Sequence, residues 1–386
     1  MNAKRTPIPF TGTPFPKAEY ESRQQRVLDA VERAGLDAIL VTTQSHLRYL
    51  TGYSGLGAYF RPFPFILAPG RAPTFIVRAF DEGTVRAESC IDEIIPYTEQ
   101  FDFPRVCADV LRRYGLHDKR VGMQLRSWGL APADVSDIEA ELPDMTIVDA
   151  TPLVPLVAAV KSEAEIEALW QSAAITDLAI ASFHRSLREG VTEAEVADAI
   201  RSDVAAAGGE LSGTISLSFG ERLRLGHGKP EAYPLKINDA VFIELSGASK
   251  DYAAALCRSA VLGRHPGLET LHSIAEEALE AGIEACKPGA TAGAVNAAVR
   301  AVMERHGRLH ALRSRTGYQI GVYWSDRGNI SLEPKAQDVI EVGMTFHMPI
   351  ILFDEDGHQI GCSESWIVTE RGSAIFSKTP HTIHRV

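Results

Sequence analysis

Residues 241–263 read Val-Phe-Ile-Glu-Leu-Ser-Gly-Ala-Ser-Lys-Asp-Tyr-Ala-Ala-Ala-Leu-Cys-Arg-Ser-Ala-Val-Leu-Gly. The apolar run that leads into Glu244 predicts a buried strand, and we expect the chain to turn at Ser246-Gly247 and to return to Arg258. A carboxylate inside an apolar strand is costly to bury. Glu244 is therefore expected either to be neutralised by a cation, for which Arg258 is the candidate, or to serve a function.

The composition is that of an ordinary globular protein large enough for two domains. The chain has 386 residues, 45% hydrophobic and 23% charged, which suffices for two full cores. A formal net charge of −11 argues against a nucleic-acid partner and against an anionic membrane surface. The five cysteines are scattered and form no CxxC pair, which favours a reduced, cytoplasmic setting. We expect neither a signal peptide nor a membrane span, because no apolar run is long enough.

The first part of the chain alternates helix and strand patterns. Helical spacing over residues 19–34 ends at Gly35, and the apolar stretch that follows predicts a buried strand. This alternation predicts an α/β domain with a mixed sheet, whose further elements are expected at residues 64–67, 73–77, 94–97, 103–114, 120–123 and 145–149.

The domain boundary is expected within residues 151–161. Just beyond it, Ser162 and Glu165 have the spacing of a capping box and predict the start of a long helix. We therefore assign an N-terminal domain to residues 1–155 and a C-terminal domain to residues 156–386.

The C-terminal domain contains an internal repeat. Six identical residues recur 99 positions apart, beginning with Gly190 and Thr192 in the first copy and Gly289 and Thr291 in the second. Each copy reads as a turn glycine, a threonine cap and an amphipathic helix stopped by glycine. The repeat predicts two α-β halves related by a pseudo-twofold axis, with the functional site between them.

Five stretches of the C-terminal domain resemble, in order, motifs of the pita-bread family of creatinase, aminopeptidase P and methionine aminopeptidase (peptidase family M24). They are Lys161-Ser-Glu-Ala-Glu-Ile, Gly226-His-Gly-Lys-Pro, Gly317-Tyr-Gln-Ile-Gly, Val342-Gly-Met-Thr-Phe-His-Met-Pro and Ser363-Glu-Ser-Trp-Ile-Val-Thr-Glu. The resemblance implies an α+β fold in which a creatinase-like N-terminal α/β domain precedes a pita-bread domain.

The resemblance also implies that the metal chemistry of the family has been lost. The five positions that hold metal ligands in metal-binding members are here Glu244, Ala255, Tyr318, Pro349 and Ser363. Hard divalent ions in a dinuclear site need several anionic oxygens, which this set does not supply, although Glu364 could replace Ser363 by a register shift. We therefore expect no metal and no other cofactor.

Within the family, the chain is most similar to the metal-independent branch of ectoine hydrolase and creatinase. The segments that carry this similarity are Val241-Phe-Ile-Glu-Leu-Ser-Gly, Gly317-Tyr-Gln-Ile-Gly, Gly343-Met-Thr-Phe-His and Leu50-Thr-Gly-Tyr-Ser-Gly. The two sequences diverge after Gly55, where ectoine hydrolase has an aromatic residue and this chain has Leu56. The substrate is therefore left open.

The two candidate catalytic residues are Glu244 and His227. The resemblance implies that Glu244 acts as a nucleophile or base. His227 lies between two glycines, where a backbone can approach a ligand closely, and an imidazole suits proton transfer at neutral pH. The alternative for His227 is a loop histidine without a role.

The candidate substrate-binding residues of the C-terminal domain are Tyr318, His347 and Glu364. Tyr318 replaces a ligand and could donate a hydrogen bond to substrate, while packing is its alternative role. His347 is either a pocket group or a core histidine. Glu364 could bind a cationic nitrogen, with simple surface exposure as the alternative. We interpret Cys257 as a small buried hydrophobe.

In the N-terminal domain, Phe60 and Arg61 resemble a pair with which creatinase reaches into its partner subunit, so we expect a homodimer and substrate binding by both. Arginine suits bidentate binding of a carboxylate. A solvated loop arginine is the alternative.

These observations predict a metal-independent hydrolase that cleaves a C–N bond of an amide, amidine or guanidine in a small polar compound. One rival is a metal-dependent Xaa-Pro aminopeptidase or dipeptidase with an unusual ligand set. The other is a degenerate pita-bread domain that binds a ligand or partner without catalysis.

Overall fold

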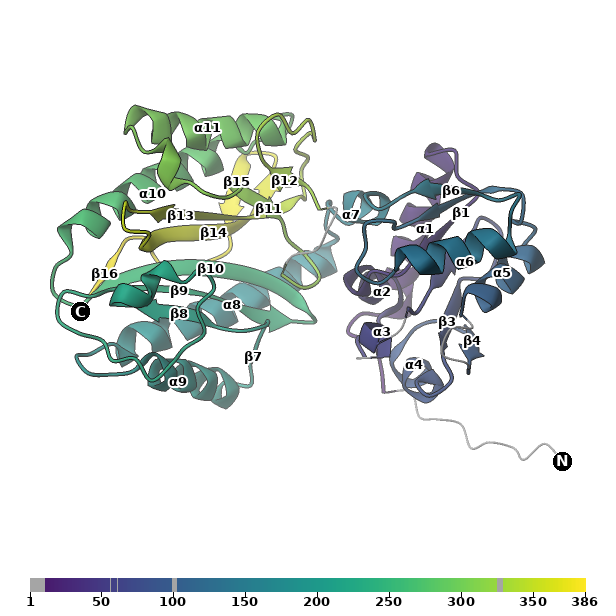
Figure 1. Ribbon diagram of the computed structural model, residues 1–386, viewed down its shortest axis with the longest axis horizontal. Coiled ribbons are helices and arrows are strands. Elements are labelled where there is room, and N and C mark those ends of the chain that lie inside the picture. Colours follow the sequence, from purple (N-terminus) through teal and green to yellow (C-terminus); the bar gives the residue numbers. More distant parts are fainter. Residues whose placement is uncertain (1–10, 56, 61, 99–102, 325–328) are drawn as a thin grey trace. The chain divides into compact units, whose positions relative to one another are not determined.

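The protein consists of two compact units in the computed structural model, which describes residues 11–386 except 56, 61, 99–102 and 325–328 (Figure 1). The first unit ends at Ala158 and the second begins at Ala159. Among the described residues, no helix is both long and apolar enough to cross a membrane.

The first unit is built on one mixed six-stranded sheet with the order β4-β3-β2-β1-β5-β6. Strand β1 (Ala38–Val41) pairs antiparallel with β2 and parallel with β5, and its four residues are all buried. The other strands are β2 (Phe65–Leu67), β3 (Thr74–Arg78), β4 (Glu93–Tyr97), β5 (Arg120–Met123) and β6 (Thr146–Asp149). The predicted mixed α/β sheet is confirmed.

The helices of the first unit include five that the periodicity analysis did not identify. Those expected were α1 (Lys17–Arg33) and α5 (Phe103–Arg113); α2 (Gln44–Thr51), α4 (Glu82–Glu88) and α6 (Pro132–Glu141) are the additional ones, together with the short α3 (Gly57–Phe60) and α7 (Leu153–Val157). Short helices lack the several turns over which helical spacing becomes recognisable.

The second unit contains two halves, each with a pair of helices that is followed by a long antiparallel hairpin. The first half comprises α8 (Glu163–Ser186), α9 (Glu193–Ala206), β7 (Glu210–Leu211), β8 (Ser216–Phe219), the 3-10 helix η1 (Gly220–Arg224), β9 (Ala240–Ser249) and β10 (Tyr252–Val261). The second comprises α10 (Pro266–Ala285), α11 (Ala292–Arg305), the 3-10 helix η2 (Leu309–Ala311), β11 (Gly317–Gln319), β12 (Ser331–Leu332), β13 (Thr345–Phe353), β14 (Gln359–Thr369), β15 (Gly372–Ile375) and β16 (His384–Arg385).

The two halves confirm the predicted internal repeat. Thr192 and Thr291 cap α9 and α11 by accepting a backbone N–H three residues on, and Gly190 and Gly289 precede them with positive φ. Each helix leads into a long antiparallel hairpin, β9–β10 or β13–β14. The two sheets lie between the helix pairs, α8 and α9 on one side and α10 and α11 on the other (Figure 1). Strands β10 and β14 are the contact between the sheets.

The hairpin β9–β10 turns later than the sequence pattern indicated. The turn lies at Lys250-Asp251 and not at Ser246-Gly247, since Ser249 and Tyr252 are the last paired residues of the two strands. Lys250 and Asp251 have positive φ angles of 52° and 67°, as a two-residue type I′ turn requires. Ser246 and Gly247 continue β9, where Gly247 packs against α8 so closely that an added Cβ would lie 2.6 Å from Ser172 O. The later turn shifts every cross-strand pair of the hairpin.

Candidate functional site

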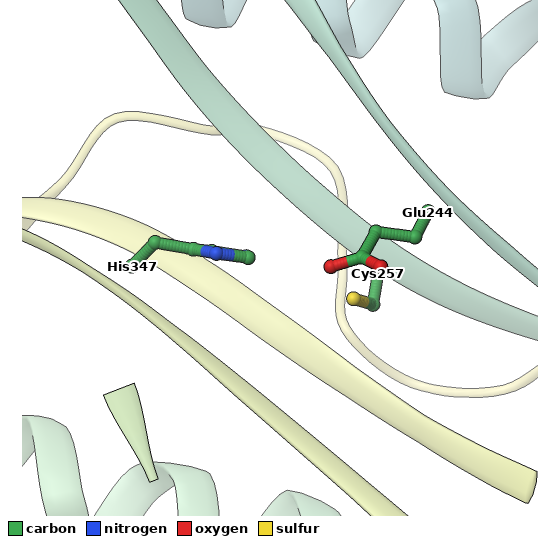
Figure 2. Close-up of side chains that lie close together, drawn as sticks. All are labelled: Glu244, Cys257 and His347. Atoms are coloured by element: carbon green, nitrogen blue, oxygen red, sulfur yellow. The ribbon is translucent and has the colours of Figure 1, made fainter. Parts of the chain in front are cut away.

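The candidate site lies where β9, β10 and β13 bring three ionisable side chains together. Glu244 and Cys257 are directly opposite each other in the β9–β10 ladder, and His347 reaches them from β13. A carboxylate oxygen of Glu244, the Sγ of Cys257 and a ring nitrogen of His347 all lie within 4.8 Å of one another, and all three residues are buried. Figure 2 shows the imidazole pointing from its strand toward the carboxylate and the thiol.

Glu244 is a buried carboxyl that forms no ion pair with any lysine or arginine in the part of the chain that the structure describes. The residue is 7% exposed, and burial raises its pKa, while a hydrogen bond with the Cys257 thiol and the nearby His227 act in the opposite direction. Arg258 is not its partner: adjacent residues of β10 point to opposite faces, and Arg258 pairs with Glu364. The prediction that Glu244 is buried is confirmed, and the alternative role for it, an ion pair with Arg258, is wrong.

His347 is held in place by two hydroxyl groups. Its Nδ1 lies 3.1 Å from Tyr318 Oη and its Nε2 lies 2.9 Å from Ser363 Oγ. Burial, together with the charge of Arg258, lowers the His347 pKa to about 3, so the ring is neutral at physiological pH. A neutral imidazole has one donor and one acceptor nitrogen, and both are engaged here.

Cys257 belongs to this cluster, and its interpretation as only a small buried hydrophobe is incomplete. Its backbone N–H donates to Ser363 Oγ at 2.6 Å, and burial together with the Glu244 carboxylate raises the pKa of its thiol well above the ordinary value. A correct prediction of the hairpin turn from the sequence would have revealed that Glu244 and Cys257 are paired. Counting outward from Lys250-Asp251, the residues opposite each other are Glu244 and Cys257.

Tyr318 lies in the same cluster with a tryptophan that the sequence analysis missed. Trp324 Nε1 donates to Tyr318 Oη at 2.9 Å, and the Arg315 guanidinium lies 4.4 Å from the centre of the Tyr318 ring. Burial raises the pKa of the Tyr318 phenol, so its hydroxyl keeps its proton. The structure thus brings Tyr318 and His347 close to Glu244 and Cys257. Together these side chains offer both hydrogen-bond donors and hydrogen-bond acceptors.

His227 lies at the solvent side of the cluster. Its Nε2 is 4.0 Å from Glu244 Oε2, and its side chain is 89% exposed. The loop that carries it is held against β8. Leu217 N donates to Gly228 O, and an added Cβ at Gly228 would lie 2.5 Å from Ser218 Oγ. The buried Glu193 carboxylate also accepts backbone N–H groups from Phe219 and Glu231 at the two ends of this loop. The two candidate catalytic residues therefore lie together.

Glu364 does not belong to the cluster. It is 2% exposed, and its carboxylate accepts from Arg258 Nη2 at 2.7 Å, with His381 Nδ1 3.5 Å away. It follows Ser363 in β14 and therefore projects to the other face of the strand. The expectation that it binds a substrate cation, and its alternative of surface exposure, are both replaced by a buried internal ion pair.

The candidate pair of the N-terminal unit is not placed by the structure. Arg61 lies outside the described residues, and only the backbone of Phe60, at the end of α3, is described. Their expected roles stay predictions.

The residues at the site do not fit a pair of hard divalent ions. The five positions implied by the resemblance do converge, since Ala255 lies two residues before Cys257 in β10, Tyr318 pairs with His347, and Pro349 pairs with Ser363. Of these, only Glu244 offers a carboxylate, and Glu364 is occupied on the other face. One carboxylate cannot offset two dications in an oxygen-rich site.

Sequence comparisons relate nearly the whole chain to two family models and to individual proteins. The family model described as Metallopeptidase family M24 matches residues 167–370, and that of the Creatinase/Prolidase N-terminal domain matches residues 23–158. The hydrolase/peptidase y4tL of Sinorhizobium fredii is 28% identical over 383 residues, covering 96% of this chain and 97% of that protein. Ectoine hydrolase of Halomonas elongata is 26% identical over 401 residues, covering 96% and 98%.

The fold also matches solved structures over nearly its full length. Dipeptidase PepE from Mycobacterium ulcerans superposes with a TM-score of 0.86 at 23% identity, covering 97% of this chain and 100% of that one. At this identity the match defines the fold alone.

Proposed function

This chain belongs to metallopeptidase family M24, and we propose that within that family it is a hydrolase that cleaves a C–N bond without a pair of metal ions. The observation that carries the proposal is the donor set of the site. Glu244 is the one carboxylate of the cluster, and it is surrounded by a thiol, a neutral imidazole and a phenol. Such a set favours acid–base or nucleophilic chemistry by the protein itself.

The proposed substrate is a small polar nitrogen compound that carries a carboxylate, such as a cyclic amidine or a guanidino acid. Ectoine hydrolase, a relative over almost the whole chain, supports this class. The cluster also supports it, because the Glu244 carboxylate can pair with a cationic nitrogen of such a compound.

Glu244 performs the central step in this proposal. It either attacks the carbon of the C–N bond, forming a covalent enzyme intermediate that water then hydrolyses, or takes a proton from the attacking water. In both cases the leaving nitrogen must gain a proton, and His227 is close enough to Glu244 to carry it. Burial of Glu244 strengthens its interaction with a cationic substrate because the local dielectric is low.

A metal-dependent dipeptidase is the second candidate, and the fold of PepE together with the name of the family favours it. A third, non-catalytic binding protein predicts ligand affinity without turnover. One assay separates the three: chelator-treated protein is given ectoine, creatine-like compounds, cyclic amides and Xaa-Pro dipeptides, and product release is measured.

Our proposal predicts turnover of a small amide, amidine or guanidine that is unchanged by the chelator. Turnover of a dipeptide that disappears with the chelator and returns with added Mn²⁺ or Co²⁺ would establish the peptidase instead. A thermal shift with a ligand that is never turned over would support the binding protein; a ligand at 100 times its Kd adds about 2.7 kcal/mol to the free energy of unfolding.

A further inference from the structure

We propose that Glu244, Cys257 and His347 form a binding site for a single thiophilic divalent cation of the Zn²⁺ type, and that its occupation blocks hydrolysis. The binding site is independent of the proposed function. Only the blocking effect depends on the proposed function, because it requires Glu244 to be the reacting carboxylate.

The three side chains come from three strands, which gives the site a rigid frame. Glu244 is on β9, Cys257 on β10 and His347 on β13, and one ligand-type atom of each lies within 4.8 Å of the others. Zinc bonds of about 2.0–2.3 Å in a tetrahedron place ligand atoms roughly 3.3–3.8 Å apart. The side chains therefore need to approach one another by no more than roughly 1–1.5 Å, which rotamer adjustment at their ends can supply.

The donor types select a soft or borderline ion. A thiolate, an imidazole nitrogen and one carboxylate oxygen are all ordinary zinc ligands, whereas Mg²⁺, Ca²⁺ and Mn²⁺ favour oxygen. When the ion binds, the Cys257 thiol releases its proton to solvent, and the resulting thiolate with the Glu244 carboxylate balances the two positive charges. This differs from a two-ion site, for which the described residues around the cluster offer no further carboxylate.

A second shell for the imidazole is already in place. Both nitrogens of His347 have hydroxyl partners, Tyr318 on Nδ1 and Ser363 on Nε2. One nitrogen exchanges its hydroxyl for the ion, and the other keeps its partner, which fixes the tautomer and the ring orientation. The cluster can therefore accept an ion without rebuilding its hydrogen bonds on both sides.

Access to the cluster is from the side of His227. This imidazole is exposed and its Nε2 is 4.0 Å from Glu244 Oε2, so it is the available fourth ligand. An ion held in this way engages both candidate catalytic residues. A carboxylate bound to zinc neither attacks a carbon nor accepts a proton from water.

The test begins with spectroscopy of the intact protein, freed of metal by chelation and then titrated with Co²⁺ as a probe for zinc. We expect one equivalent to bind, with a thiolate-to-cobalt charge-transfer band in the near ultraviolet that added Zn²⁺ removes. Cys257→Ser should abolish this band, and His347→Gln should weaken Zn²⁺ binding more than about tenfold in calorimetry.

Two control variants distinguish this site from adventitious binding. Cys90→Ala removes the half-buried thiol of the first unit, and His358→Gln disrupts the other group of three potential ligands found in the described chain, Asp354, Asp356 and His358. Both should keep the band and the affinity. The proposal is overturned if the wild-type protein shows no thiolate band, an outcome that does not depend on the folding of any variant. It is also overturned if Cys90→Ala loses the band or if His358→Gln loses Zn²⁺ binding.

The activity of the same samples tests the blocking effect. One equivalent of Zn²⁺ should remove turnover of the chelator-treated enzyme, and renewed chelation should restore it. Zn²⁺ bound at the cluster with turnover unchanged would overturn the blocking effect and the assignment of Glu244, while leaving the binding site. Turnover without any Zn²⁺ binding would overturn the site and leave the proposed function.

Discussion

Glu244 and Cys257 face each other across the β9–β10 hairpin, and the thiol hydrogen-bonds the carboxylate in the interior of the second unit. Among the described residues, neither side chain has a lysine or arginine as its partner, since Arg258 points to the opposite face and pairs with Glu364. A buried carboxyl held only by a thiol and a nearby exposed imidazole is costly for stability. Such a cost is characteristic of sites retained for chemistry.

Glu244→Gln should lower kcat by about three orders of magnitude or more with a modest change in KM, because glutamine keeps the shape of the side chain but neither attacks nor accepts a proton. Steady-state kinetics on the substrate identified by the assay above measures this. A variant that folds normally by circular dichroism and keeps more than about a tenth of wild-type turnover rules out the assignment.

His227→Asn should cost less, on the order of 10²–10⁴-fold in kcat, because water can partly replace a proton carrier. The side chain is exposed, so stability should hardly change. When this variant is combined with Glu244→Gln, the two losses should not multiply, since the residues act on one reaction step. Multiplicative losses in the double variant would show that the two act separately.

Gly228→Ala should reduce kcat through the position of His227 alone. An added Cβ would lie 2.5 Å from Ser218 Oγ and 3.3 Å from Leu225 O, so the loop has to move. Gly226→Ala is the matched control on the other side of His227, because nothing lies within 4 Å of its added Cβ. Kinetics should show a clear loss for the first and wild-type behaviour for the second; equal behaviour of the two would mean that loop position is unimportant.

Arg258→Met should destabilise the protein by about 3–5 kcal/mol, because it leaves the buried Glu364 carboxylate without its guanidinium. Arg258→Met combined with Glu364→Leu should recover most of the loss, since both charges are then gone. Urea unfolding measures the free energies. A double variant less stable than the single one would contradict the view that the pair is an internal structural element.

The free energy of unfolding should fall as the pH is lowered from about 6.5 to 4, with His184 as one contributor beside the buried His347. Burial, with the nearby His384 and Arg258, lowers the His184 pKa from 6.5 to about 4. Between these values the unfolded chain binds a proton that the folded one does not, so stability rises with pH there and levels off above about 6.5. His184→Gln should flatten this slope in urea unfolding at a series of pH values. An unchanged slope would assign the pH dependence to other groups.

The sequence alone determined helices α8, α9 and α11 of the second unit and the burial of Glu244, because helix caps and hydrophobic periodicity act over a few residues. The threonine caps at Thr192 and Thr291, and the glycines before them, lie in the structure where the repeat predicted. The motifs also placed Tyr318, His347 and Ser363 near one another by resemblance, and the strand register agrees.

Only the tertiary structure decided which side chains meet. The sequence pattern placed the β9–β10 turn at Ser246-Gly247, whereas packing of Gly247 against α8 extends the strand to a turn at Lys250-Asp251, and this register sets Cys257 opposite Glu244. The approach of β14 to β10 gives Arg258 to Glu364, and the pairing of β13 with β14 gives Ser363 to His347. A one-residue change of register exchanges the two faces of a strand, so contacts between strands far apart in the chain depend on the packing of whole sheets and not on local sequence.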